Sequence, residues 1–277
     1  MTIFRQDCQQ SASVVLCSGL LLMVDIHSHI LPQIDDGSHS LDESIEMCRA
    51  SADDGIRVMV ATPHAHDGTH TTHDPELLNR RVEELNNQLH GNPKIVLGCE
   101  LRFTHEIVKQ LCETHTASTI AGGPYALIEF PHSMVPPGSE RPLFELMSNH
   151  ITPIIAHPER NAMLINEPNR FYELVSIGVL GQMDTGSITG QFGKRVQKTA
   201  RVMLENGLIH FIASDCHNTR NRLPGMSAAV ALTAKFVGEE YARAMADDNP
   251  AAVVEGRPIP TCPTATIPKT RKWFLFG

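Results

Sequence analysis

Residues 24–40, VDIHSHILPQIDDGSHS, place an apolar, strand-like run directly before a concentration of histidines and aspartates. His27 and His29 are separated by one residue, and Asp35 and Asp36 follow just before a glycine. In a β-strand, residues i and i+2 point to the same side, so both histidines can reach one ligand. The stretch therefore predicts a strand whose carboxyl end carries side chains of the metal-ligand type.

Strand-length apolar runs recur along the rest of the chain, and helix-length patterns separate them. The seven predicted strands cover residues 22–26, 57–62, 94–99, 125–130, 152–157, 178–183 and 208–214. The predicted helices cover residues 40–55, 74–89, 104–112, 139–149, 168–176, 190–206 and 226–246. Ser40 and Glu43 form a capping box for the first helix, and Asp74 with Pro75 forms a cap and first-turn pair for the second.

This alternation of strand and helix indicates a parallel sheet. The chain lacks a dinucleotide-binding glycine motif, and seven repeated units favour a barrel over an open sheet. A length of 277 residues is normal for one α/β barrel domain. The predicted fold is therefore an α/β barrel of seven strand–helix units.

Residues 23–260 are expected to form that single domain. Residues 1–22 contain an apolar run too short to span a membrane and a poor match to a signal peptide, so they are interpreted as an extension outside the fold. Residues 261–277 change character toward proline and then toward basic and aromatic residues, which indicates an appended tail.

The composition excludes several classes of protein. A formal net charge of −8 argues against binding to duplex nucleic acid, although a metal cluster could still attract an anionic substrate. The seven cysteines form no CxxC pair, which argues against a disulfide scaffold or a zinc knuckle and favours a reduced, cytoplasmic chain. No stable membrane insertion is expected, and a homo-oligomer remains open.

Six of the seven predicted strands end in a side chain that can bind a metal. These are His27 and His29, His64, Glu100, Glu129, His157, and Asp215 with His217, in chain order. The remaining strand offers only Asp184, as an outer partner. Catalytic residues converge at the carboxyl rim of a parallel barrel, and imidazole with carboxylate suits manganese, iron or zinc. The pattern predicts a metal centre.

The alternatives differ from residue to residue. A single strand-end histidine such as His64 or His157 is more often structural, so the joint pattern carries the prediction. Asp36 is the preferred ligand from the loop after the first strand, and Asp35 is the alternative. The histidines expected outside the centre are His66, His70 and His73 in a polar rim loop, and His39, His90, His105, His115, His150 and His210 at surface or packing positions.

Two arginines follow the predicted ligands closely. Arg160 is three residues after His157, and Arg222 is five residues after His217. A guanidinium beside a metal cluster is suited to hold phosphate oxygens through paired hydrogen bonds. The alternative is a surface ion pair for each, and Arg220 competes for the role of Arg222.

The segments DIHSHILPQIDDG, ATPH, GCE, LIEFP, AHPER and ASDCHN resemble the PHP (polymerase and histidinol phosphatase) superfamily. More narrowly, they resemble the CpsB/CapC-like, manganese-dependent protein-tyrosine phosphatases encoded with bacterial capsule and exopolysaccharide genes. The resemblance runs from about residue 23 to residue 260. The N-terminal extension, the tail and the loop after His64 depart from it.

The resemblance implies a distorted (β/α)7 barrel with three divalent metal ions, most commonly Mn²⁺, with iron or zinc as alternatives. It implies nine ligands, with Glu100 bridging: His27, His29, Asp36, His64, Glu100, Glu129, His157, Asp215 and His217. Phosphate-contacting roles for Arg160 and Arg222 also follow from the family pattern. The implied activity is hydrolysis of phosphotyrosine, on a bacterial tyrosine kinase that regulates capsule or exopolysaccharide synthesis.

The same sequence also bears on two other phosphatase chemistries. The same site could act on a small phosphate monoester such as histidinol phosphate or a sugar phosphate. A cysteine phosphatase is not expected, because no C-x5-R loop is present and Cys216 precedes Arg222 by six positions. Cys216 is interpreted as a packing residue between two ligands.

Overall fold

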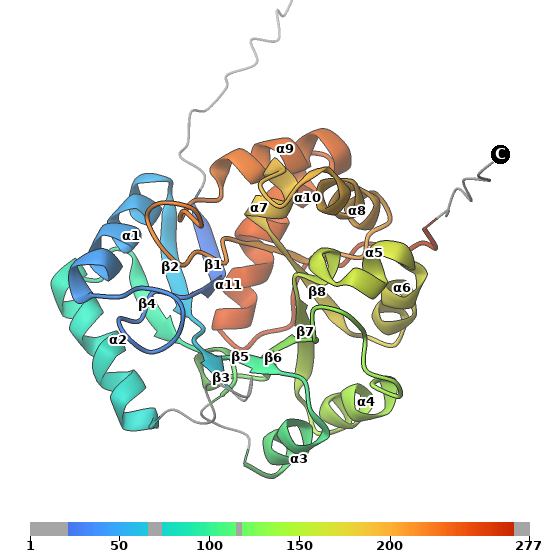
Figure 1. Ribbon diagram of the computed structural model, residues 1–277, viewed down its shortest axis with the longest axis horizontal. Helices are drawn as coiled ribbons and strands as arrows, with labels where there is room; N and C mark the ends of the chain where they lie inside the picture. The colour runs from blue at the N-terminus through green and yellow to red at the C-terminus, as the bar shows by residue number, and fades with distance from the viewer. Residues whose placement is uncertain (1–21, 66–73, 115–117, 269–277) are drawn as a thin grey trace, which may run out of the picture.

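The computed structural model describes residues 22–65, 74–114 and 118–268. In these ranges the chain forms nine strands, with helices arranged around them (Figure 1). The strands are β1 (Met23–Ser28), β2 (Ile56–Ala61), β3 (His64–Ala65), β4 (Lys94–Leu97), β5 (Glu100–Arg102), β6 (Tyr125–Glu129), β7 (Thr152–Ala156), β8 (Leu180–Asp184) and β9 (Phe211–Ala213).

Eleven α-helices and two short 3-10 helices connect these strands within the same ranges. The α-helices are α1 (Leu41–Asp53), α2 (Pro75–Leu89), α3 (His105–Thr114), α4 (Glu140–Ser148), α5 (Ala162–Asn166), α6 (Asn169–Ser176), α7 (Thr185–Thr189), α8 (Lys194–Glu205), α9 (Ser227–Val237), α10 (Glu239–Ala246) and α11 (Asp248–Val254). The 3-10 helices are η1 (Ile120–Gly122) and η2 (Pro158–Arg160).

The strands form two parallel sheets, with orders β1-β2-β4 and β3-β5-β6-β7-β8-β9. The expected count of seven strands is not confirmed, because two predicted strands are each continued by a second, short one. Thr62 and Pro63 separate β2 from β3, and Gly98 and Cys99 separate β4 from β5. Pro63 has no N–H for a sheet ladder, which accounts for the first break. The parallel α/β architecture itself is confirmed.

Hydrogen bonds also join the first strand to the segment after the last one. Asp215 N donates to His27 O at 2.9 Å, and His29 N donates to Cys216 O at 2.9 Å. The buried Asp25 adds a bond from Ser214 N at 3.1 Å. The carboxyl ends of β1 and β9 are therefore neighbours, which brings their site residues together.

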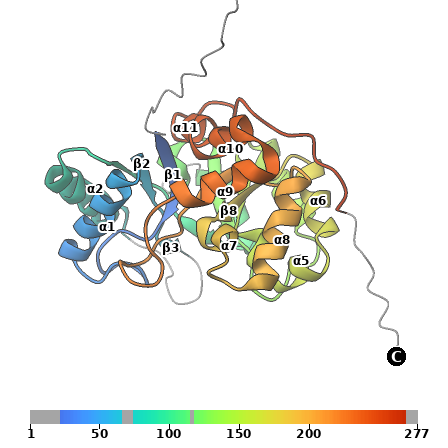
Figure 2. The ribbon, with the colours of Figure 1, turned by 90° about the horizontal axis from the view of Figure 1, so that it is seen from above.

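Side chains on opposite faces of the strands enter two separate apolar cores. On β6, Tyr125 and Leu127 belong to an inner core, whereas Ala126 and Ile128 belong to an outer core shared with the helices. Helix α11 adds Val253 to the inner core, and the view from above shows α11 beside β1 (Figure 2). The inner positions change from apolar to polar at the carboxyl ends of the strands, where Glu129 follows Leu127.

The helices show where local sequence signals were sufficient. Ser40 Oγ accepts from Glu43 N at 3.2 Å, and Asp74 Oδ1 accepts from Glu76 N at 3.0 Å, so both predicted caps are confirmed. The single helix predicted over 226–246 is wrong, because Gly238 adopts a φ of 88° between α9 and α10. Likewise, Gly190 and Gly193 have positive φ angles and delay the start of α8.

Other features bear on the domain description. No helix in the described ranges is both long and apolar enough to cross a membrane. All five cysteines in the described part of the chain are unpaired. Residues 261–268 contact the domain, since Thr261 N donates to Asn249 Oδ1 and Thr266 N donates to Asn206 O. Residues 1–21 and 269–277 lie outside the described residues, and so do His66, His70, His73 and His115.

Candidate metal centre

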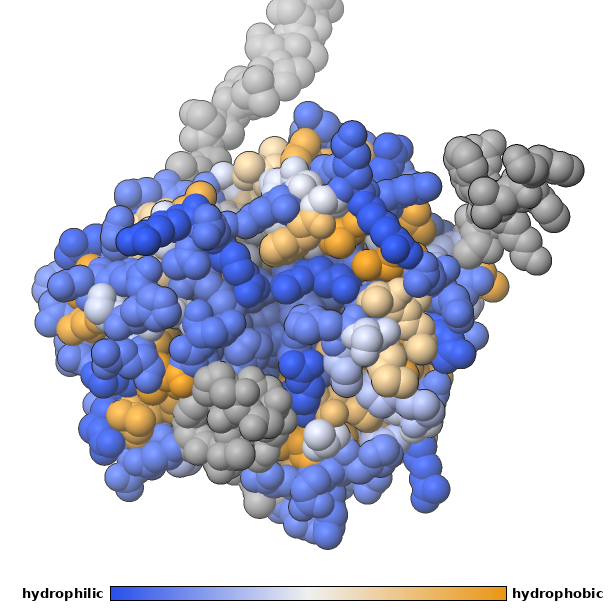
Figure 3. Space-filling view, viewed as in Figure 1, coloured by the Kyte–Doolittle hydropathy of each residue, from blue (hydrophilic) through white to orange (hydrophobic). Residues whose placement is uncertain are grey.

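A polar pocket of about 370 Å³ lies where the carboxyl ends of the strands meet. Figure 3 shows a hydrophilic hollow at the centre of the face that Figure 1 views. The pocket is lined by Asp36, His64, Glu100, Arg102, Glu129, His132, His157, Arg160, Asp215, His217 and Arg222. Nine of the eleven residues predicted for the site are in this lining. The other two, His27 and His29, are buried against it.

Three groups of side chains bring their ligand atoms within 4.8 Å of one another. The groups are His29, Asp36, His64 and His217; His27, His29 and Glu100; and His64, Glu100 and Glu129. His29, His64 and Glu100 each belong to two groups. Glu100 therefore occupies the shared position that a bridging carboxylate would need.

The two remaining predicted ligands lie against these groups. Asp215 Oδ1 is 3.4 Å from Nε2 of both His27 and His29. His157 Nε2 is 3.0 Å from Glu100 Oε1 and 3.7 Å from Glu129 Oε1. The structure thus brings all nine predicted ligands into one continuous cluster.

The outer nitrogens of the imidazoles show how the rings are oriented. His29 Nδ1 lies 2.7 Å from Asp35 Oδ2, and His217 Nδ1 lies 3.1 Å from the carbonyl oxygen of Asp215. Both partners only accept hydrogen bonds, so Nδ1 is the donor and Nε2 faces the cluster. Outer acceptors of this kind are typical of histidines that bind metal ions, and the donor set fits a metal centre.

Asp35 and Asp36 have different surroundings. Asp35 holds His29 from behind, and its Oδ2 also accepts from His64 N at 3.0 Å. Asp36 lines the pocket, with Oδ1 at 3.3 Å from His217 Nε2 and 3.5 Å from His64 Nε2. The geometry therefore puts Asp36 among the candidate ligand groups and Asp35 behind His29.

Opposite charges decide the electrostatics of the cluster. Burial alone would lower the pKa of His27, but Glu100 and Asp215 raise it to about 9. Burial opposes ionisation of Glu100 as well, yet His27 and other imidazoles hold its pKa well below the usual range. These carboxylates are paired with imidazolium charge. A divalent cation would supply that charge instead and release the protons.

Two proposed ligands have unusual backbone conformations. His157 has a φ of 32° and Asp215 has a φ of 50°, in the left-handed region that non-glycine residues rarely adopt. Such conformations persist where the surrounding structure enforces them, and they are common at functional sites. Here they turn both side chains toward the pocket directly after β7 and β9.

Arg160 and Arg222 both reach Asp215. Arg160 Nη1 donates at 2.7 Å to Asp215 Oδ2 and at 2.7 Å to Asp184 Oδ2, while its guanidinium lies over the ring of Phe192. Arg222 donates to Asp215 Oδ2 and, at 2.8 Å, to His217 Nε2.

Arg220 is exposed and does not line this pocket, so the geometry separates it from Arg222. Arg222, and not Arg220, therefore lies where it could reach a bound phosphate.

Sequence reasoning missed three polar residues at the site. Arg102 lines the pocket and pairs with Glu129 at 3.0 Å, and His132 lines it from the loop after β6. Gln182 lies 2.9 Å from His27 Nδ1. A signal existed for two of them, because Arg102 and Gln182 lie two strand positions from Glu100 and Asp184 and so share their faces.

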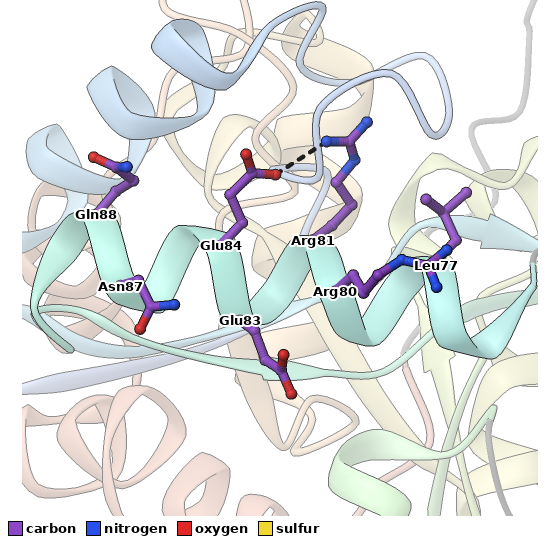
Figure 4. A pocket seen from close by; sticks show the side chains of 7 residues that line it. All are labelled: Leu77, Arg80, Arg81, Glu83, Glu84, Asn87 and Gln88. Atoms are coloured by element: carbon purple, nitrogen blue, oxygen red, sulfur yellow. Dashed lines mark hydrogen bonds and ion pairs between the residues drawn. The ribbon is translucent and has the colours of Figure 1, made fainter.

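Other histidines and hollows lie away from the centre. His39, His90, His105 and His150 are exposed and His210 is buried, as predicted for surface and packing positions. A larger surface hollow, of about 580 Å³, runs along α2 (Figure 4). It is lined by Leu77, Arg80, Arg81, Glu83, Glu84, Asn87 and Gln88. This lining belongs to one helix and contains no histidine, so it offers no comparable donor set.

Comparison with known proteins agrees with this geometry. Tyrosine-protein phosphatase YwqE of Bacillus subtilis (strain 168) is 36% identical over 257 residues, covering 92% of this chain and 100% of the relative. Tyrosine-protein phosphatase CpsB of Streptococcus pneumoniae is 32% identical over 239 residues, covering 84% of this chain and 98% of the relative.

Solved structures extend the comparison to the fold. One chain from crystal structures of YwqE from Bacillus subtilis and CpsB from Streptococcus pneumoniae, called unique metal-dependent tyrosine phosphatases, matches with a TM-score of 0.83 and 33% identity. The match covers 90% of this chain and 100% of that chain. Dihydropyrimidinase from Brevibacillus agri NCHU1002 matches with a TM-score of 0.50 and 12% identity over 84% of this chain and 70% of its own, which is a likeness of fold alone.

A family model described as "Capsular polysaccharide synthesis, CpsB/CapC" matches residues 23–255. The matched range begins at β1, ends just after α11 and includes every proposed ligand and both arginines. The chain therefore belongs to the CpsB/CapC family of capsular polysaccharide synthesis.

Proposed function

We propose that this chain is a metal-dependent protein-tyrosine phosphatase. Its substrate would be phosphotyrosine on a bacterial tyrosine kinase that regulates capsule or exopolysaccharide synthesis. The observation that carries the proposal is the convergence of three ligand groups and two arginines on one pocket. The names of the relatives, which are tyrosine-protein phosphatases, support the same activity.

The metal centre in this proposal holds three divalent ions, most commonly Mn²⁺, with iron or zinc as alternatives. The residues that would hold them are His27, His29, Asp36, His64, Glu100, Glu129, His157, Asp215 and His217. When bound, such ions polarise phosphoryl oxygens and acidify a water molecule. Mixed imidazole and carboxylate donors suit these metals.

The arginines then bind and orient the phosphate. Asp184 and Asp215 fix Arg160 through one terminal nitrogen, Nη1, and among the described residues its other N–H groups remain for substrate oxygens. Arg222 approaches the same pocket from the loop after β9. Fixed guanidinium groups stabilise charge on the equatorial oxygens without reorganising during the reaction.

We also propose that the two sheets form one distorted (β/α)7 barrel. In this arrangement β3 and β5 continue β2 and β4, and the bonds between the β1 end and Cys216 close the ring. Residues 23–260 would be the domain, flanked by an extension and a tail. A cytoplasmic location is consistent with the unpaired cysteines, and assembly into a homo-oligomer is compatible with this proposal.

Substrate choice is the first test. Purified full-length protein would be assayed for metal content and for phosphate release from a phosphotyrosine peptide and from histidinol phosphate, with and without added Mn²⁺. The proposal expects bound metal and Mn²⁺-dependent turnover that favours the phosphotyrosine peptide. Turnover that strongly favours histidinol phosphate would instead support a small-molecule phosphatase.

Arg222 and Arg220 provide a matched pair of variants. Arg222→Ala should lower kcat by about 100- to 1000-fold, as removal of a donor to transition-state charge typically does. Arg220→Ala should stay within about twofold of the unmodified protein, because this side chain is exposed outside the pocket. Equal effects of the two substitutions would contradict the assignment of Arg222.

A further inference from the structure

Strand β8 supplies none of the proposed metal ligands, yet two of its side chains contact the site. One contacts a proposed metal ligand, and the other contacts an arginine proposed to bind phosphate. Gln182 and Asp184 are buried, with 0% and 1% of their surface exposed. They are two positions apart on one strand and therefore share its inner face. Met183, between them, belongs to the outer apolar core. The strand thus places two adjacent polar groups inside the fold, beneath the pocket.

Gln182 contacts a proposed metal ligand with one end of its amide and an acid with the other. Its Nε2 donates to Asp184 Oδ1 at 3.1 Å, and its Oε1 lies 2.9 Å from His27 Nδ1. Asp184 Oδ1 accepts this bond, so the NH₂ group of the amide points toward Asp184. Oε1 then faces His27, whose Nδ1 must carry the proton. Nε2 of His27 is then the nitrogen that faces Glu100 and Asp215, and it could bind a metal ion once its own proton is released.

Asp184 continues the contacts to the phosphate-binding side. Its Oδ2 accepts from Arg160 Nη1 at 2.7 Å, and the same nitrogen donates to Asp215 Oδ2 at 2.7 Å. Asp215 Oδ1 lies 3.4 Å from His27 Nε2. The contacts therefore form a closed ring through His27, Gln182, Asp184, Arg160 and Asp215.

We propose that Gln182 is a positioning residue with two effects. It orients His27 directly, so that Nε2 faces the metal site, and it holds the guanidinium of Arg160 in place through Asp184. The role rests on the proposed function, because it assumes that His27 binds a metal ion and that Arg160 binds phosphate. A glutamine is the side chain that meets both demands at this position. It accepts at one end, donates at the other and adds no charge to a buried site.

Two substitutions separate the two contacts of the amide. Gln182→Leu removes both contacts at nearly constant size. Gln182→Glu keeps an acceptor for His27 but loses the donor to Asp184 and places two carboxylates side by side. Gln197→Leu is the matched control, because Gln197 is exposed on α8 and its Nε2 bonds only the backbone oxygen of Ile188 among the described contacts.

The full-length variants would be compared in three measurements. Mn²⁺ affinity would be obtained by competition with a chelator, phosphate affinity from inhibition of aryl phosphate turnover, and folding from thermal unfolding of the metal-free protein. Loss of an outer partner of a metal-binding histidine typically costs 10- to 100-fold in metal affinity. Gln182→Leu should therefore weaken Mn²⁺ binding by about 10- to 100-fold and should also weaken phosphate inhibition.

Gln182→Glu should instead keep Mn²⁺ affinity within a few-fold and weaken phosphate inhibition by about tenfold, roughly the effect of one lost hydrogen bond. Gln197→Leu should match the unmodified protein in all three measurements. A purely structural role would lower the unfolding temperature of the Gln182 variants without this division between metal and phosphate.

The proposal is overturned if Gln182→Glu changes both affinities equally, or if both Gln182 variants bind Mn²⁺ and phosphate like the unmodified protein. It is also overturned if the unmodified protein binds no metal. Should Gln182→Leu fail to fold, Gln182→Glu still decides between these outcomes. Failure of the proposed substrate is distinguishable, because a protein inactive on phosphotyrosine would still show the predicted pattern in Mn²⁺ binding.

Discussion

Individual histidines in this chain occupy two contrasting environments. Those of the centre lie beside carboxylates, and Glu100 and Asp215 raise the pKa of the buried His27 to about 9. His210 is equally buried, but no carboxylate in the described part of the chain pairs with it, and its Nδ1 accepts from Gly181 N at 3.1 Å. Burial therefore lowers the pKa of His210 to about 4. The same side chain thus serves as a charge partner in one place and as a neutral acceptor in the other.

His210 should make folding sensitive to acid. Its pKa is depressed in the folded state, so the unfolded chain takes up a proton first as pH falls below about 6.5. Between about pH 7.5 and pH 5 this one group should remove roughly 2 kcal/mol of stability. His210→Asn keeps an acceptor for Gly181 and does not titrate. Urea unfolding of metal-free protein at the two pH values should show a loss smaller by about that amount in the variant. Equal losses would contradict the assignment.

At the scale of elements, the loop after β1 returns onto the strand that it leaves. Ser38 N donates to His29 O at 3.1 Å, and Gly37 N donates to Asp35 Oδ1 at 3.0 Å. A Cβ added at Gly37 would lie 2.1 Å from the backbone oxygen of His29. Only glycine allows the close approach that keeps Asp35 behind His29 and Asp36 over the pocket.

Gly37→Ala should therefore loosen the loop and lower Mn²⁺ affinity. We expect at least a tenfold loss, about the smallest cost usually seen when partners around a ligand are displaced. Ser40→Ala, three residues further along, is the control. It should cost about 1 kcal/mol of stability through the lost helix cap without changing Mn²⁺ affinity. A chelator competition series on the three proteins tests both expectations, and unchanged affinity in Gly37→Ala would argue against the loop's role.

Elements also show what could be predicted from the sequence. The strands could be predicted from apolar runs, and the cluster from the ligand-type residues at the strand ends. Both signals lie in short, continuous stretches of the sequence. The breaks at Pro63 and Gly98 and the short helices α5 and α7 were missed, since each is too brief to show a period. The role of Gln182 could not be predicted either, because it depends on the spatial neighbourhood of β8 and β1.

At the scale of the whole molecule, the apolar inner core and the polar pocket occupy opposite ends of the strands. Residues such as Val24, Leu127 and Val253 pack at one end, and the ligand cluster lies at the other. Folding should therefore depend mainly on apolar burial. A metal ion that binds only the folded chain should raise the free energy of unfolding by about 2.7 kcal/mol at a free metal concentration of 100 times Kd.

Metal removal tests this division. Added Mn²⁺ should raise the thermal unfolding midpoint, and a chelator should reverse the rise, because the ligand cluster forms only in the folded chain. His157→Ala should retain most of the metal-free midpoint, since His157 lies outside the apolar cores, but should lose most of the Mn²⁺-dependent increase. Scanning calorimetry of both proteins, with Mn²⁺ and with chelator, measures the metal-free midpoint and the Mn²⁺-dependent increase. A large drop in the metal-free midpoint of His157→Ala would contradict this expectation. It would show that imidazole–carboxylate pairs, such as His157 with Glu100, stabilise the folded pocket without a metal ion.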